Sequence, residues 1–338
     1  MESILISVIM ANYKTKIEYL KEAIDSILNQ TYSNLELIII DDCSQDESVE
    51  YIQSINDIRV KLLINKKNCG PAITRNRGLK VAKGKYIAIM DSDDISLPTR
   101  LEKQMNYMER NPDVIVCGTW FEKFGIHNMV RKPIIDDFEF YRCQLLFSNT
   151  PLIMCHSSAM IRKSYLDKYQ IFYDASLLKS QDYGLWVECS KYAKIVILNE
   201  VLVKYRTHFT QISTATTKEQ LNYACLVSRR QLQGLEIDFC EEENRWRYSH
   251  IIDKADLLKF EFWLCKIKEN NESKQIYNTL AMERYLDLML NRAIQELNIF
   301  NRLSLYIHNS NIRAFYSRKF KEKTKRKKND YKRRCSCV

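Results

Sequence analysis

The first residues that suggest chemistry are Asp91-Ser92-Asp93-Asp94, three carboxylates within four positions, directly after the apolar run from Tyr86 to Met90. Several carboxylates on one loop suit a hard divalent cation such as Mn²⁺ or Mg²⁺. Such a cation would bridge the diphosphate of a nucleotide and neutralise its charge as it leaves. Taken alone, the four residues are equally consistent with a solvated acidic turn that caps the helix expected near Pro98.

A second acidic pair, Asp41-Asp42, follows the apolar run from Leu35 to Ile40. A carboxylate beyond a buried strand can accept hydrogen bonds from a nucleobase edge or from ribose hydroxyls. The alternative is helix N-capping by Asp42 or by Ser44, because Ser44 forms a capping-box pattern with Glu47. Capping explains one acidic residue well and two less well.

Four single residues could also take part in chemistry. Arg75 could bind a diphosphate as a bidentate donor, although an isolated arginine more often lies on a surface face. Asp182 could remove a proton from an acceptor hydroxyl, although a lone aspartate can cap a helix. His156 and His208 could help to hold a metal or a phosphate, although a lone histidine more often has a structural role.

The first 120 or so residues alternate between apolar runs, typical of buried strands, and segments with helical spacing. Strands are expected at 4–10, 35–40, 59–64, 86–90 and 114–120. This alternation predicts a largely parallel sheet with helices on both faces. Ligands bind beyond the carboxyl ends of such strands. We therefore expect the acidic groups to collect at one edge of the sheet.

The composition is that of an ordinary globular protein, with 46% hydrophobic and 28% charged residues. No apolar run reaches the roughly 18 residues that a membrane-spanning helix needs, and we expect a cytoplasmic protein. The eleven cysteines include no C-x-x-C pair. This pattern predicts reduced thiols and argues against a structural zinc site.

The net charge of +10 is concentrated near the end of the chain, where residues 318–334 contain eleven Lys or Arg and two acidic residues. Aromatic residues for base stacking are limited to Phe320 and Tyr331, so we do not expect nucleic acid binding. An anionic membrane surface is the better partner, at ~1 kcal/mol per basic residue, and a disordered solvating tail is the alternative. The final Cys335-Ser336-Cys337-Val338 has the form of a prenylation signal, with Ser336 a poor match.

Taken together, these pieces resemble a family 2 glycosyltransferase with the GT-A fold. Seven segments carry the resemblance, in the family's order: 7–13, 20–32, 35–44, 68–84, 86–98, 155–162 and 181–186. The segment 20–32, L-K-E-A-I-D-S-I-L-N-Q-T-Y, is very close to the family's first helix. Cys43 stands where glycine is more usual, and Gln181 where an acidic residue is common, but the matching Asp182 is present. The resemblance covers about residues 3 to 213.

The resemblance implies a role for each matched residue. Asp182 would be the general base. The acceptor-side residues would be His156, Ser157 and Trp186. Asp93 and Asp94, with His208, would hold the metal, Mn²⁺ or Mg²⁺. The nucleotide-binding residues, which would contact uracil, the nucleoside and the phosphates, would be Ala11, Asn12, Tyr13, Asp41, Asp42, Arg75, Ser92 and Asp93.

The predicted reaction is inverting transfer of a sugar from a UDP-sugar to a hydroxyl of a glycan or lipid-linked saccharide. A single base without a carboxylate nucleophile favours inversion. A sugar-phosphate nucleotidyltransferase, the first alternative, would need an early glycine-rich loop, and residues 11–20 contain no glycine. The second alternative is a binding protein that has lost catalysis, against which Asp93, Asp94 and Asp182 argue.

The predicted fold is therefore an α/β domain with a GT-A, Rossmann-like mixed sheet, largely parallel and flanked by helices. This catalytic domain would span residues 1–213. A helical C-terminal region would follow over 214–317. The basic tail, 318–338, would be disordered and would place the protein at the cytoplasmic face of a membrane as a peripheral protein.

Overall fold

The computed structural model describes residues 3–133, 137–147, 154–208, 218–238, 246 and 251–296. The chain divides into two compact units, one that ends at Gln233 and one that begins at Gly234. The predicted tail over 318–338 lies outside the described residues. So does the predicted boundary after residue 213, which falls in the segment 209–217.

The first unit is built on a mixed sheet with the strand order β3-β2-β1-β4-β8-β6-β9-β5, and β7 pairs with β6 outside this path. The strands are β1 (Ile6–Asn12), β2 (Leu35–Asp41), β3 (Val60–Ile64), β4 (Tyr86–Asp91), β5 (Ile95–Ser96), β6 (Val114–Gly125), β7 (Met129–Arg131), β8 (Met160–Arg162) and β9 (Lys194–Thr207).

The strands β3, β2, β1 and β4 run parallel. The short β8 is antiparallel to both β4 and β6 and separates them, and β6 and β9 are again parallel to each other. The mixed, largely parallel sheet that the sequence predicts is confirmed. The apolar runs predicted β1, β2 and β4 because these strands are buried on both faces, whereas β3 is partly exposed.

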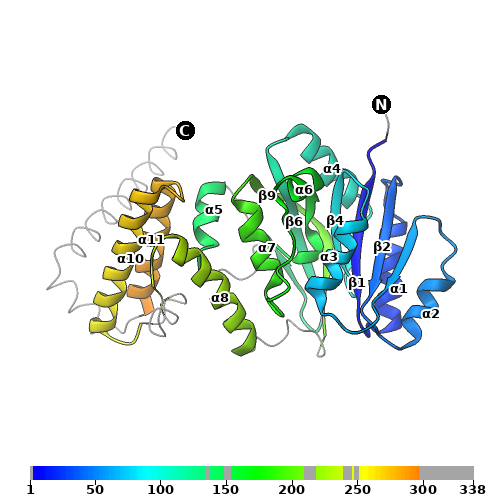
Figure 1. The fold of residues 1–338 in the computed structure, drawn as a ribbon, viewed down its shortest axis with the longest axis horizontal. Helices are drawn as coiled ribbons and strands as arrows, with labels where there is room; N and C mark the ends of the chain where they lie inside the picture. Colours follow the sequence, from blue (N-terminus) through cyan, green and yellow to red (C-terminus); the bar gives the residue numbers. More distant parts are fainter. Residues whose placement is uncertain are drawn as a thin grey trace, which may run out of the picture. The chain divides into compact units, whose positions relative to one another are not determined.

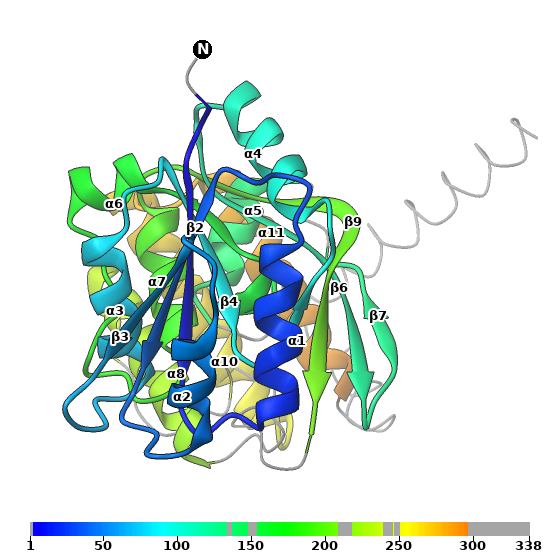
Figure 2. The ribbon, with the colours of Figure 1, turned by 90° about the vertical axis from the view of Figure 1, so that its right-hand side faces the viewer.

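Helices cover both faces of this sheet. They are α1 (Ile17–Leu28), α2 (Glu47–Ser54), α3 (Pro71–Val81), α4 (Arg100–Arg110), α5 (Phe138–Gln144), α6 (Lys163–Tyr169), α7 (Gln181–Ser190) and α8 (Lys218–Gly234), with a 3₁₀ turn η1 at His156–Ser158. Figure 2 shows α1 on one side of β1 and β2 and α3 on the other.

Two apolar cores lie on the opposite faces of the sheet, because neighbouring residues of a strand point to opposite sides. Val8 of β1 packs with Leu20 of α1 in one core. Ile9 of the same strand packs with Leu79 of α3 in the other. Val227 of α8 belongs to this second core, so the first helix of the region predicted as C-terminal packs on the first unit.

The predicted capping box at Ser44 is wrong. The N-cap of α2 is Asp46, whose side chain accepts a hydrogen bond from the backbone of Ser48. The Ser44 hydroxyl donates to Asp41 instead, and it accepts a hydrogen bond from the backbone N–H of Lys14, 3.0 Å away. The Ser44 side chain therefore bonds to a residue thirty positions earlier in the chain, Lys14, and does not cap the helix as the local pattern predicts.

The second unit contains α10 (Lys254–Lys274) and α11 (Thr279–Glu296), labelled in Figure 1. Lys268 of α10 forms an ion pair with Glu283 of α11 at 2.8 Å. Among the described helices, none is long and apolar enough to cross a membrane. Every cysteine in the described part of the chain is a free thiol, as predicted.

Candidate active site

Three adjacent parallel strands end at one edge of the sheet and carry the predicted polar residues. Asn12 of β1 lies next to Asp41 of β2, and Ala11 of β1 lies next to Asp91 of β4. The Asn12 amide donates to the Asp41 carboxylate at 2.8 Å. The expectation that acidic groups collect at this edge is confirmed, because the register of the parallel strands brings their ends together.

The carboxylates of Asp41 and Asp42 are buried and already hold protein groups, with 0% and 4% of each residue exposed. Asp42 accepts hydrogen bonds from the backbone N–H groups of Cys69 and Gly70, both at 2.8 Å. It also accepts one from the Asn65 amide at 2.7 Å. Asp42 therefore fastens the loop before α3 to the end of β2, and its contact with a nucleobase stays a prediction.

The predicted residues Ala11, Tyr13 and Ser92 lie at the same edge. Tyr13 follows β1 directly and has 48% of its surface exposed. The Ser92 hydroxyl is 2.6 Å from that of Thr15, so it ties the loop after β4 to the segment after β1. Their roles in nucleotide binding stay predictions.

Arg75 points from α3 to the end of β4, where one guanidinium nitrogen donates to Asp91 at 2.7 Å. Only 8% of Arg75 is exposed. Its Nε and Nη1 atoms are buried without a hydrogen-bond partner among the described residues. Burial alone would raise the pKa of Asp91, but Arg75 and His156 hold that pKa well below its usual range. The ion pair therefore stays charged and leaves two guanidinium nitrogens free to donate to an anion.

A chain of polar contacts continues from Asp91 to the acceptor side. His156 Nδ1 is 3.3 Å from the Asp91 carboxylate, and its Nε2 is 2.8 Å from the Tyr173 hydroxyl. Asn76, the neighbour of Arg75, holds the backbone of Tyr173 on both sides, at 2.8 and 2.7 Å. The contacts thus return to α3, so Arg75 and His156 are fixed relative to each other.

The loop after β4 places its last two aspartates differently. Asp93 is 3.0 Å from Nε2 of His208, just beyond β9. Asp94 is fully buried and accepts hydrogen bonds from the backbone of Arg206, at 2.8 Å, and from the Ser157 hydroxyl. Burial raises the pKa of Asp93 and of Asp94, and the neighbouring carboxylates add to the rise.

These positions partly fit the predicted metal. Within the described part of the chain, no group of three or more His, Cys, Asp or Glu residues is placed to hold a metal ion. Mg²⁺ commonly uses one or two carboxylates and takes its remaining ligands from substrate phosphates and water. Asp93 and His208 fit such a partial set. The two oxygens of Asp94 already hold protein groups, so its role as a ligand stays a prediction.

The predicted general base, Asp182, lies near Arg75 and Tyr173. Asp182 is in the first turn of α7, and its carboxylate is within electrostatic reach of Arg75 and Tyr173. Trp186, one turn later on α7, lies with its ring centroid 6.1 Å from that of His156. The structure therefore brings the predicted base, donor-side arginine and acceptor-side residues into one neighbourhood.

Sequence comparison identifies the family. The model of Glycosyl transferase family 2 matches residues 7–170. An uncharacterized glycosyltransferase of Methanocaldococcus jannaschii is 34% identical over 73% of this chain and 86% of its own length. The chain belongs to glycosyltransferase family 2. The UDP-Glc:α-D-GlcNAc-diphosphoundecaprenol β-1,3-glucosyltransferase WfaP of Escherichia coli is 32% identical, over 64% of this chain and 82% of that enzyme.

The fold of this glycosyltransferase resembles that of S. aureus TarS 1-349, whose crystal structure was determined in complex with UDP-GlcNAc. The TM-score is 0.57 at 16% sequence identity, and the match covers 85% of this chain and 90% of the TarS chain. This likeness supports the GT-A fold. The predicted family, fold and enzyme class are thereby confirmed.

Two residues of the glycosyltransferase that sequence reasoning missed lie beneath the site on α4. Arg100 is fully buried and donates to the backbone carbonyls of Ile89 and Ala159, at 3.0 and 3.1 Å. Gln104 donates to the carbonyl of Ser158 at 2.8 Å. Burial lowers the pKa of Arg100 to about 10. Together they hold the η1 turn against β4, a role that no spacing of charged residues indicates.

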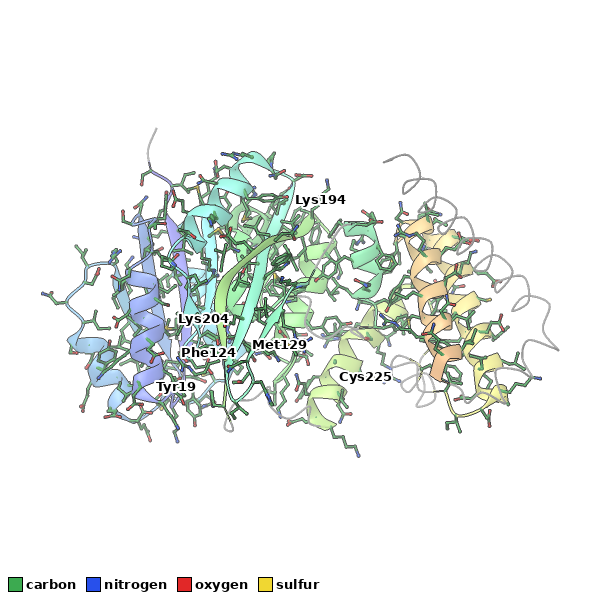
Figure 3. The ribbon with its side chains drawn as sticks, turned by 180° about the vertical axis from the view of Figure 1, so that it is seen from behind. Tyr19, Phe124, Met129, Lys194, Lys204 and Cys225 are labelled. Carbon is green, nitrogen blue, oxygen red and sulfur yellow. The ribbon has the colours of Figure 1, made fainter. Side chains whose placement is uncertain are left out.

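A third missed residue, Arg206, joins β9 to the metal-side loop. Its side chain donates to the Asp93 carbonyl at 2.7 Å and pairs with Glu22 of α1 at 2.5 Å. The guanidinium lies over the rings of Tyr19 and Phe124, 4.2 and 4.4 Å from their centroids. Figure 3 labels both aromatic residues. In the segment Tyr205-Arg206-Thr207-His208, only His208 has a chemical role that the sequence alone suggests.

Proposed function

We propose that this glycosyltransferase moves a sugar from a UDP-sugar to a hydroxyl of a lipid-linked saccharide, with inversion at the anomeric carbon. The observation that carries the proposal is the buried Arg75, which has two unpartnered nitrogens at the edge where β1, β2 and β4 end. Buried cationic donors without a partner are costly unless they bind a ligand. A diphosphate is the ligand that suits a guanidinium fork.

The relatives support the choice of donor and acceptor. WfaP is named for transfer from UDP-Glc to a saccharide on diphosphoundecaprenol, and TarS was crystallised with UDP-GlcNAc. They give no support to a nucleotidyltransferase or to an inactive binding protein. We propose the same classes of donor and acceptor for this chain, without assigning the sugar.

In the proposed reaction, Asp182 removes the proton from the acceptor hydroxyl as that oxygen attacks the anomeric carbon. Arg75 donates to the diphosphate, which departs from the opposite side of the carbon. Glycosyltransferases of the GT-A fold generally use a divalent metal. Asp93 and His208 would hold it here, where it would neutralise charge on the leaving diphosphate. His156 and Trp186 line the side from which the acceptor approaches.

The test is nucleoside diphosphate release from a panel of nucleotide-sugars, with Mn²⁺, Mg²⁺ or EDTA, in the presence of lipid-diphosphate saccharides. We expect one UDP-sugar to react, in a metal-dependent way. UDP binding measured directly, by calorimetry, separates donor recognition from chemistry. No binding of UDP or of any nucleotide-sugar would overturn the proposal.

We also propose that the basic residues between 318 and 334 draw the enzyme to an anionic membrane, where a lipid-linked acceptor resides. Eleven Lys or Arg in this segment give the charge that such binding needs. Deleting 318–338 should abolish sedimentation with vesicles that contain anionic lipid and leave UDP binding unchanged. Undiminished sedimentation of the truncated protein would contradict this proposal.

A further inference from the structure

The outer halves of β6 and β9, together with β7, form an extension of the sheet whose two faces differ. Lys123 of β6 is in register with Met129 of β7 and with Tyr205 of β9, and Phe121 is in register with Arg131. Residues in register, and residues two apart on a strand, point to the same face. These five side chains therefore share one face, which we call the Lys123 face. Figure 2 shows the three strands side by side at the edge of the sheet.

The opposite face of the extension balances its charges. Arg206 forms an ion pair with Glu22, and Lys204 is in register with Glu122. Lys132 also belongs to this face, because its ammonium group lies 5.2 Å from the Trp120 ring centroid. Figure 3 labels Lys204 on this extension. Arg206 and Lys204 thus each have a carboxylate as a neighbour on this face, and Lys132 has an aromatic ring.

The five side chains of the Lys123 face include two cations and no carboxylate. Lys123 is half-buried, with its ammonium group 5.7 Å from the Tyr205 ring centroid. Burial, and then the positive charge of Arg131, lower the pKa of Lys123. Among the described residues, no carboxylate lies within electrostatic reach of Lys123. Lys123 is half-buried and Arg131 is exposed, and their like charges repel each other. An anion bound between them would relieve that repulsion.

This face is continuous with the acceptor side of the active site. Phe121 forms a small buried cluster with Cys155 and Val203, and Tyr205 packs against it. Cys155 immediately precedes His156 and is within electrostatic reach of Lys123. Lys123 therefore lies close to the residue that precedes the η1 turn.

We propose that Lys123 and Arg131 bind the phosphate group through which the acceptor saccharide is attached to its carrier. The proposal rests on the proposed function, because it presumes a phosphate-linked acceptor. A diphosphate offers several anionic oxygens, which suit the planar fork of an arginine and the point charge of a lysine. The Tyr205 ring beside Lys123 gives an apolar surface on which a sugar or the start of a lipid can rest.

The experiment compares the affinity of two synthetic probes in the presence of saturating UDP. One is N-acetylglucosaminyl diphosphate carrying a short alkyl chain, and the other is the alkyl N-acetylglucosaminide without phosphate. The test variant is Lys123→Met with Arg131→Met. The matched control, Lys132→Met with Lys204→Met, removes equal charge from the opposite face of the same strands. Thermal unfolding of all three proteins checks that each is folded.

We expect the test variant to bind the diphosphate probe at least about tenfold more weakly than the wild type, as charge-assisted contacts are lost. Its affinity for the neutral probe and for UDP should not change, and the control should match the wild type. Higher salt should weaken diphosphate binding in the wild type more than in the test variant.

Three results would overturn the proposal. These are equal affinity of wild type and test variant for the diphosphate probe, an equal loss for both probes, and failure of the wild type to bind the diphosphate probe. Failure of the proposed function is a separate result, because it appears as an absence of UDP binding in the wild type.

Discussion

The proposed donor side and the proposed acceptor side of this glycosyltransferase are held together in different ways. On the donor side, Asp41 and Asp42 each hold several protein groups, within the ends of adjacent strands and the loop before α3. On the proposed acceptor side, His156 and Tyr173 come from separate segments, and one hydrogen bond joins their side chains. The proposed donor half is therefore fixed by more hydrogen bonds to the protein than the contact between His156 and Tyr173 provides.

The largest expected effect concerns the acceptor side, and it is a loss of turnover. Asp182→Asn removes the proposed base but keeps the size of the side chain. Loss of general-base help should lower turnover by about 10²–10⁴. UDP affinity, measured by calorimetry, and the free energy of unfolding should stay near those of the wild type. A variant that keeps more than a tenth of the wild-type turnover would show that another group takes the proton.

The next effect concerns the donor side and appears in stability. Asp42→Ala leaves the backbone N–H groups of Cys69 and Gly70 and the Asn65 amide without their buried acceptor. Each unsatisfied donor costs about 1–3 kcal/mol, and relaxation reduces the sum, so we expect a loss of about 3 kcal/mol. Urea unfolding measures it.

The control for this change is Asp46→Ala, which removes an N-cap far less connected to the site and should cost about 1 kcal/mol. If the two variants were equally stable, Asp42 would not be the fastening residue that its contacts indicate.

A smaller effect is expected for Tyr173→Phe, which removes one hydrogen bond to His156. The free energy of unfolding should fall by about 1 kcal/mol. UDP affinity should change by less than about twofold, because Arg75 keeps its contact with Asp91. A large loss of UDP affinity would mean that the donor side depends on the acceptor side, so the two sides would not be held in place independently.

The smallest effect concerns the end of β2 remote from the site. Glu36 is buried and accepts hydrogen bonds from Ser7, Lys61 and the backbone of Lys83. Burial acts to raise the pKa of Glu36, but these partners together lower it. A lowered pKa in the folded state means that the carboxylate stabilises the protein above the unfolded pKa, and that this stabilisation is lost as pH falls through the folded value.

The measurement compares wild type with Glu36→Gln by urea unfolding between pH 3 and pH 7. The wild type should be more stable by about 1 kcal/mol near pH 7, and the difference should shrink as the pH falls below 4.5, the ordinary pKa of a glutamate. A difference that stays constant with pH would show that the charge of Glu36 does not contribute.

Much of the donor side could be predicted from the sequence, because its signals are local. The apolar runs of β1, β2 and β4 mark buried strands, and the polar residues that follow them must share an edge once those strands are parallel. The same reasoning missed Tyr173, Arg100 and Arg206. They lie outside the motifs, and their partners are distant in the chain.

The sequence by itself determined the family, the alternation of strands and helices, and which residue types stand at the carboxyl edge. Only the tertiary structure decided the partner of each charge. Asp94 bonds to the backbone of Arg206, 112 residues away, and Asp91 pairs with Arg75 and His156 from two other elements. The physical reason is that local patterns report burial and backbone conformation, whereas a buried charge selects its partner from whatever the folded chain brings within reach.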